Sequence, residues 1–193
     1  MANYDISYRI VMGNEGGYAN KSTDAGGETY KGISRKWWPK WAGWAIIDAV
    51  KAVRPIKWNE EIQDYYLKIN VKTFYKAYWR SFGGDKLVDQ DIANIMFDMY
   101  VLTGDDGVKI AQRVCNAMGY NLKVDGVMGD LTAGAINSLN PEAFFSRYFT
   151  AREKFHRAVA AGNAETGMPN LEGWLRRLYK FHYVFTKKKS LAC

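Results

Sequence analysis

The sequence predicts a mainly α-helical protein with a small β element near its N-terminus. From residue 89 onward, apolar side chains recur at helical spacing in one segment after another, separated by glycines or by Asn140-Pro141. Near the N-terminus, residues 16–33 are too rich in glycine to form a helix, and residues 29–33 have the pattern of a short strand. With 193 residues, of which 48% are hydrophobic, the chain can bury a sizeable core.

The first helix is expected over residues 4–15. Ile6, Ile10 and Val11 recur at helical spacing there. Glu15 follows one turn after Val11, and the two residues after it are glycines, which tolerate the left-handed backbone that closes a helix. The carboxylate of Glu15 would therefore lie at the rim of a cleft.

The other helices are predicted from the same apolar pattern and from residues that cap or interrupt helices. Ser34 can cap a short helix through the tryptophans, which Pro39 interrupts, and Asn59 can cap a longer one. Apart from the short helix, we expect them over residues 44–53, 59–79, 92–102, 108–118, 131–139, 142–161 and 171–184.

The best internal boundary is the glycine-containing segment 83–90, because neither a linker nor a shift in composition marks another one. It divides the chain into a first lobe, residues 1–88, a helical second lobe, residues 89–185, and a basic tail, residues 186–193. Two lobes that share one core fit the sequence as well as two independent domains.

The net charge of +7 favours polyanionic partners, which include nucleic acid, acidic membranes and the bacterial envelope. Charge alone does not choose among them. No clustered basic helix or recognition motif supports nucleic-acid binding. The sequence contains no stretch of transmembrane length.

Cysteine and histidine are sparse. A disulfide between Cys115, in an apolar helical pattern, and Cys193, the last residue, is improbable, so a reducing site of synthesis is expected. His156 and His182 are far apart and have no cysteine ligand nearby. We therefore expect neither a metal site nor a cofactor.

Two carboxylates nine residues apart, Glu15 and Asp24, lie in different surroundings. Hydrolysis of a glycosidic bond needs a proton on the leaving oxygen and a way to stabilise or capture an oxocarbenium-like centre. Glu15, at a helix end among aromatic residues, would lose solvent and remain protonated as a general acid. Asp24, in a polar glycine loop, would stay ionised and orient a water molecule, helped by Thr29 or Tyr30. On spacing alone, a helix-end glutamate and a turn-forming aspartate remain the simpler interpretation.

The motifs around these residues resemble the signature of glycoside hydrolase family 108, a group of bacterial and phage enzymes that cleave peptidoglycan. They are Glu-Gly-Gly-Tyr at residues 15–18, Asp-Ala-Gly-Gly-Glu-Thr at residues 24–29 and Gly-Ile-Ser at residues 32–34. The resemblance implies that Glu15 is the catalytic glutamate.

The order of glutamate, aspartate and threonine also resembles phage-type lysozymes, which implies a lysozyme-like fold and site. In those lysozymes the step from the aspartate to the threonine is one residue longer than the step from Asp24 to Thr29. Tyr30 could therefore occupy the place of the threonine, and the choice between Thr29 and Tyr30 stays open.

Further landmarks of the family resemble Tyr78-Trp79, residues 84–87 and Phe97-Asp98, so that the likeness covers most of residues 5–185. Tyr18 and Trp79 are candidate sugar contacts, although a tryptophan that ends an apolar helix is more often part of a core. Asp98 lies on an otherwise apolar helix. Because a carboxylate is costly to bury unpaired, Asp98 either pairs with a base or faces the substrate.

Residues 125–132 resemble the Asp-Gly-x-x-Gly-x-x-Thr turn of small helical peptidoglycan-binding modules. The resemblance implies that the second lobe is peptidoglycan-binding-like. A tight turn followed by a helix cap also explains these residues without any ligand.

Together, the resemblances imply a peptidoglycan hydrolase of the muramidase type, which cuts between N-acetylmuramic acid and N-acetylglucosamine. Inversion is expected if the two carboxyl groups lie roughly 6.5 to 9.5 Å apart, with room for a water molecule between them. A lytic transglycosylase, which needs an acid and no water, and a non-catalytic wall-binding or assembly protein are the alternatives. Because no signal peptide is visible, we expect synthesis in the cytoplasm and action on the cell wall after release or export, as for a phage-like endolysin.

Overall fold

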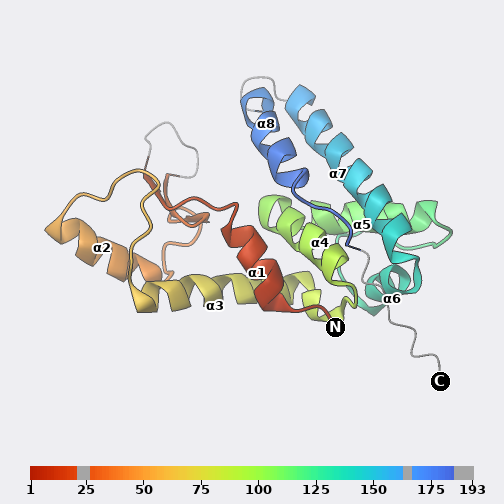
Figure 1. Cartoon of the computed structure of the whole chain (residues 1–193), viewed down its shortest axis with the longest axis horizontal. Coiled ribbons are helices and arrows are strands. Elements are labelled where there is room, and N and C mark those ends of the chain that lie inside the picture. The colour runs from red at the N-terminus through yellow and green to blue at the C-terminus, as the bar shows by residue number, and fades with distance from the viewer. Residues whose placement is uncertain (21–26, 163–166, 185–193) are drawn as a thin grey trace. The chain divides into compact units, whose positions relative to one another are not determined.

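The computed structural model describes residues 1–20, 27–162 and 167–184. In these residues the chain forms eight α-helices, a short 3-10 helix and a small three-stranded antiparallel sheet near the N-terminus (Figure 1). The prediction of a mainly α fold with a small β element is therefore confirmed. None of the helices in the described ranges is long and apolar enough to cross a membrane.

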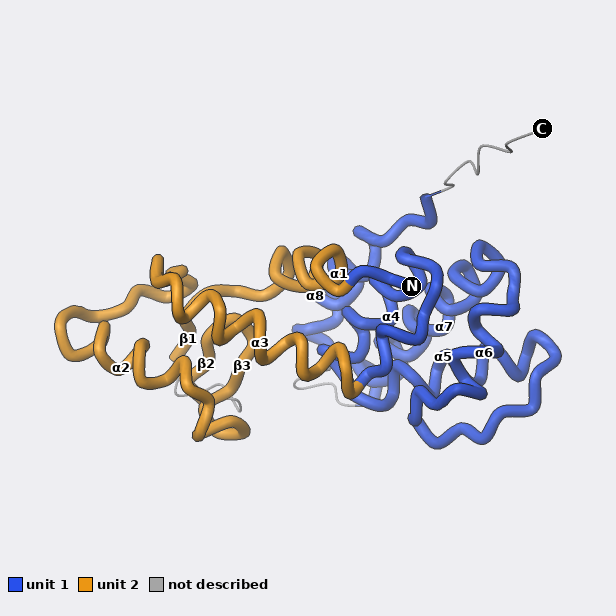
Figure 2. Tube along the Cα trace, turned by 90° about the horizontal axis from the view of Figure 1, so that it is seen from below, with its two compact units in different colours: residues 1–3, 82–193 blue, residues 4–81 orange. Residues whose placement is uncertain are grey.

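The chain divides into two compact units (Figure 2). What we call the first unit consists of residues 4–81, which are orange and marked unit 2 in Figure 2. The second unit consists of residues 1–3 with residues 82–193, which are blue and marked unit 1 there. Residues 1–3 belong to the second unit because the amide of Ala2 donates to the carbonyl of Leu87 at 2.8 Å. The predicted tail, residues 186–193, lies outside the described residues.

The first unit combines helices with the sheet. Its elements are α1 (Tyr4–Met12), β1 (Tyr18–Asn20), β2 (Glu28–Tyr30), β3 (Ile33–Ser34), α2 (Gly43–Val53) and α3 (Tyr65–Phe82). The strands pair in the order β1-β2-β3. Because successive residues of a strand point to opposite faces, Glu28 and Tyr30 share one face of the sheet and Thr29 lies on the other.

The core of this unit takes side chains from helices and sheet alike, as the mixed α and β pattern requires. Those with no exposed surface include Val11, Ile33, Ile47, Leu67 and Trp79.

Gly16 and Gly17 have a different role from the predicted one. Neither has a positive φ, so neither closes α1 with a left-handed backbone. A Cβ on Gly17 would lie 2.5 Å from the carbonyl oxygen of Asn59, and the amide of Gly17 donates to the Asn59 side chain at 2.8 Å. The glycine pair therefore provides the space in which residues 59–60 run against this segment.

The long third helix begins later than predicted because Asn59 does not cap it. Asn59 has a φ of 61°, and its amide donates to the carbonyl of Tyr18 at 2.7 Å. The side chain of Asp64 caps α3 instead, accepting the amide of Leu67 at 2.7 Å. The short helix expected after Ser34 is also absent, because the segment forms turns there.

The second unit is helical. Its elements are η1 (Gly84–Lys86), α4 (Gln90–Thr103), α5 (Asp106–Ala117), α6 (Asp130–Ser138), α7 (Pro141–Gly162) and α8 (Gly167–Leu178). α7 contacts α4, α5, α6 and α8, and is thus the central element of this unit. α4 is buried over residues 92–99, and the side chain of Asp89 caps it by accepting the amides of Asp91 and Ile92 at 3.0 Å each.

Candidate active site

Glu15 lies in the turn that follows α1, where its amide still donates to the carbonyl of Val11 at 3.0 Å. Its side chain is half-buried. The carboxylate lies against Gly32, in the turn between β2 and β3, so closely that a Cβ on Gly32 would clash with it. The same Cβ would lie 2.8 Å from the hydroxyl oxygen of Tyr75. Glu15 is therefore held between the end of α1, the β2–β3 turn and α3.

Contacts with α3 hold the β2–β3 turn in place. Tyr75 is buried, and its hydroxyl donates to the carbonyl of Lys31 at 2.7 Å. Gly32 has a φ of 75°, a conformation that glycine adopts without strain. These contacts give the Glu15 carboxylate a rigid surface on one side.

The three other predicted catalytic residues have different positions. Asp24 lies outside the described residues, and its role stays a prediction. Tyr30 is buried, and its hydroxyl accepts the amide of Ile62 at 3.2 Å. Thr29 is half-buried on the opposite face of the sheet.

Tyr18, a predicted sugar contact, is buried and uses its hydroxyl inside the protein. It donates to Glu28 at 2.7 Å, and Glu28 also accepts hydrogen bonds from Arg35 at 2.8 Å and from Lys51 at 2.7 Å. Burial raises the pKa of Glu28, but the hydrogen bonds from Lys51, Arg35 and Tyr18 outweigh it and bring the pKa below its usual value. Glu28 is thus kept ionised as a structural anchor, which makes it a poor proton donor.

Trp79 does not offer a platform to a sugar in this structure. The residue is 0% exposed, and its ring packs against that of Tyr4 at 5.9 Å between centroids. This placement differs from the expected sugar contact and agrees with the alternative that a tryptophan ending an apolar helix belongs to the core.

Asp98 likewise lies in the interior, in the second unit. It is 0% exposed, and its two oxygens accept hydrogen bonds from Arg152 at 2.6 Å and from Arg177 at 2.7 Å. Of the two expectations for this carboxylate, the pair with a base is what the structure has. Because Asp98 is fully buried, it offers no surface to a substrate.

His156 extends this buried network. Its Nε2 accepts a hydrogen bond from Nε of Arg152 at 3.3 Å, and its ring stacks on Trp174. Burial, reinforced by the neighbouring charge of Arg152, lowers the pKa of His156 to about 4. The imidazole is therefore neutral at pH 7 and acts as an acceptor.

An exposed aromatic hollow in the first unit is lined, in the described part of the chain, by none of the predicted site residues. It measures about 360 Å³ and is lined by residues 37–41 and by Phe74 of α3. Trp37 and Trp38 are 68% and 44% exposed. The tryptophans stand out in the sequence, but their exposure does not, because it depends on which rings α2 and α3 cover.

Ring contacts connect this hollow with the surroundings of Glu15. Tyr75 lies beside the Glu15 carboxylate, and the centroid of its ring is 6.2 Å from that of Tyr78. The ring centroid of Tyr78 is in turn 6.0 Å from that of Trp38. A continuous row of aromatic side chains along α3 therefore leads from the carboxylate to the exposed tryptophans. Among the residues that the structure describes, no group of three metal-ligating side chains is present.

Comparison with known families decides the classification. The sequence model of Glycosyl hydrolase 108 matches residues 8–104. The chain belongs to glycosyl hydrolase family 108. A second model, Predicted Peptidoglycan domain, matches residues 106–179. A family 108 member with such a domain is a glycoside hydrolase that acts on peptidoglycan.

The fold of this family 108 chain is similar to that of a solved structure, SagA of Brucella abortus. The two are 20% identical, the likeness covers 92% of this chain and 94% of SagA, and the TM-score is 0.59. At this level of identity the likeness concerns the fold alone. A search of curated proteins found no match.

Proposed function

We propose that this family 108 enzyme is a muramidase that hydrolyses the bond between N-acetylmuramic acid and N-acetylglucosamine, with Glu15 as general acid. The observation that carries the proposal is the position of the Glu15 carboxylate, half-buried and held against the Gly32 turn beside Tyr75. A proton donor must keep a fixed geometry toward the leaving oxygen, and these contacts supply it.

In the proposed reaction, Glu15 gives its proton to the glycosidic oxygen as the bond to the anomeric carbon breaks. A water molecule adds its oxygen to that carbon from the opposite face and gives a proton to Asp24, which inverts the anomeric configuration. Thr29 is the better candidate to hold this water, because the hydroxyl of Tyr30 is engaged with the backbone of Ile62.

The aromatic hollow at residues 37–41 would bind the glycan next to this centre. Pyranose rings have apolar faces that pack on flat aromatic side chains, and ligand sites combine such surfaces with a few polar groups. The row of rings between Tyr75 and Trp38 supports a glycan path that starts at Glu15.

The decisive experiment compares Glu15→Gln with wild type on purified cell wall. The substitution keeps the size of the side chain and removes the acid, so we expect release of fragments to fall by about 10²–10⁴-fold. Glu172→Gln, at an exposed glutamate of α8, is the control and should keep full activity. Retained activity in Glu15→Gln would contradict the assignment.

Mass spectrometry of the wild-type products identifies the reaction. Reducing muramic acid ends support hydrolysis, and NMR of fresh products should show inversion at the anomeric carbon. 1,6-Anhydro ends would instead identify a lytic transglycosylase. Wall that sediments with the protein but stays uncut would identify a binding protein.

A further inference from the structure

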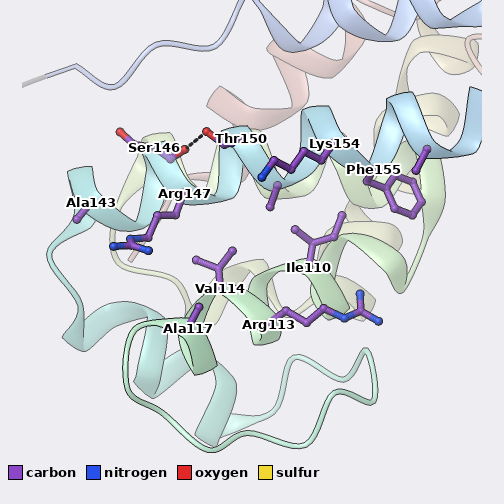
Figure 3. Close-up of a pocket in the computed structure, with 12 residues that line it drawn as sticks. Ile110, Arg113, Val114, Ala117, Ala143, Ser146, Arg147, Thr150, Lys154 and Phe155 are labelled. Carbon is purple, nitrogen blue, oxygen red and sulfur yellow. Dashed lines mark hydrogen bonds between the residues drawn. The ribbon is translucent and has the colours of Figure 1, made fainter.

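A large groove runs between α5 and α7 in the second unit (Figure 3). Its volume is about 870 Å³. Small and apolar side chains from both helices form its floor, so that it presents an apolar surface to solvent. They include Ile110, Val114 and Ala117 of α5 and Ala143, Ala151 and Phe155 of α7.

Three cations border this floor: Arg113 from α5, and Arg147 and Lys154 from α7. All three are exposed, and no carboxylate is among the described residues that line the groove. Within the described ranges, none of the three forms an ion pair, whereas other cations of α5 and α7 do. Those paired cations are Lys109 with Asp106, Arg152 with Asp98 and Arg157 with Glu153.

The charge and the floor select the chemistry of a ligand. Neutral sugar rings would be expected to use flat aromatic side chains, and of the described residues lining the groove only Phe155 supplies one. The remaining polar side chains are Ser146 and Thr150, and the hydroxyl of Thr150 already donates to the carbonyl of Ser146 at 3.0 Å. The groove therefore suits a short anionic ligand with small apolar groups.

We propose that the α5–α7 groove binds the stem peptide of peptidoglycan through its carboxylates and its alanine methyl groups. The inference rests on the proposed function for the nature of the substrate. All lining residues fall within residues 106–179, the range of the Predicted Peptidoglycan domain. The glycan would then be bound by the first unit and the peptide by the second.

The spacing of the cations fits this ligand. Arg147 and Lys154 are seven residues apart on α7, which corresponds to about 10 Å along the helix axis. An extended peptide segment of three residues spans about the same length. Carboxylates at the two ends of such a segment can thus reach both side chains, while methyl groups between them face the apolar floor.

The test measures binding of a free stem tetrapeptide to the full chain carrying Glu15→Gln. Because this variant lacks the proposed general acid, it leaves the ligand and the wall intact. The double substitution Arg147→Gln, Lys154→Gln should weaken this binding about fivefold to tenfold, the sum of two exposed ion pairs. Arg157→Gln removes a cation of α7 that lies outside the groove, and should leave the affinity unchanged. Ala151→Trp fills the floor without changing the charge and should also weaken binding.

Several results would overturn the inference. Equal affinity of the double variant and of Arg157→Gln for the tetrapeptide would do so. Equal binding of intact wall and of wall whose stem peptides have been removed would do so too. Tighter binding of a synthetic acidic amphipathic helix than of the tetrapeptide would assign the groove to a protein partner. No detectable binding of the tetrapeptide to the Glu15→Gln chain, while the wild-type chain releases muramidase fragments from wall, would refute this inference alone. Tetrapeptide binding by the Glu15→Gln chain, while the wild-type chain releases no glycan fragments, would refute the proposed function alone.

Discussion

Gly32 is subject to two separate constraints. Its φ of 75° is strained for any residue with a side chain, and a Cβ would clash with the Glu15 carboxylate. The first constraint concerns stability. The second concerns the position of the proposed general acid.

The two constraints can be separated by mutation. Gly32→Ala should lower the free energy of unfolding by about 1–2 kcal/mol and, because it displaces the Glu15 carboxylate, reduce kcat at least tenfold. Gly27→Ala is the control, since Gly27 has a similar φ of 64° and, its chain neighbours aside, no atom of the described residues lies within 4 Å of its Cβ position. Denaturant unfolding and turnover on purified wall are measured for both variants. A similar loss of kcat in both would mean that backbone strain, and not contact with Glu15, is responsible.

His156 gives the protein a predictable dependence on pH. Burial, with the charge of Arg152, lowers its pKa in the folded state to about 4, while the unfolded chain has the ordinary value near 6.5. The unfolded state therefore binds the proton more tightly. The stability due to this residue is complete above about pH 6.5 and is lost as the pH falls toward 4, by up to about 3 kcal/mol.

A Gln at this position keeps a hydrogen-bond acceptor for Arg152 and cannot take up a proton. His156→Gln should therefore flatten the fall in stability between pH 6.5 and pH 4, even if it lowers stability at pH 7. His182→Gln, at an exposed histidine, serves as the control and should leave the slope unchanged. An unaltered slope in His156→Gln would show that other groups govern the acid sensitivity.

The aromatic hollow combines the turns of residues 37–41 with α3. Phe74 lies 5.1 Å from Trp38 in an edge-to-face arrangement, so α3 fixes the inner ring while Trp37 stays open to solvent. The hollow is thus a preformed surface, which lowers the entropic cost of binding a glycan.

If glycan stacks there, Trp37→Ala should weaken binding of N-acetylglucosamine oligosaccharides about threefold to tenfold and raise KM for wall with little change in kcat. Trp58→Ala is a matched control, because Trp58 is 68% exposed, as Trp37 is, and does not line the hollow. Titration by intrinsic fluorescence measures the affinity. Identical affinities in the two variants would remove the hollow from the proposed glycan path.

Across the chain, helical periodicity predicted most of the helices, because apolar spacing reports directly on a buried helix face. It could not predict where α3 begins, since Asn59 is held in its left-handed conformation by a partner on β1. Nor could it decide between core and site for Asp98. The bases that neutralise Asp98 are 54 and 79 residues away along the chain, and only the packing of α4, α7 and α8 brings them together.

The sequence predicted the position of Glu15 along the chain, at the end of the first helix, to within one helical turn. It did not predict which residues surround the Glu15 side chain. Its neighbours Gly32 and Tyr75 come from β2–β3 and α3, and local spacing contains no information about either contact. A resemblance to a family supplies the role of such a residue, whereas the contacts that hold it require the fold.

The net charge of +7 belongs to the molecule as a whole and should govern its attachment to wall, which carries many carboxylates. Screening shortens electrostatic interactions to about 10 Å at 0.1 M salt and about 3 Å at 1 M. We therefore expect sedimentation of the Glu15→Gln chain with purified wall to weaken at least tenfold between these concentrations. Binding of neutral N-acetylglucosamine oligosaccharides, which relies on aromatic contacts, should change less than twofold and is the control. If binding of both ligands depends equally on salt, charge does not distinguish wall attachment from glycan binding. If the affinity for wall does not change with salt concentration, the basic surface has no role in docking.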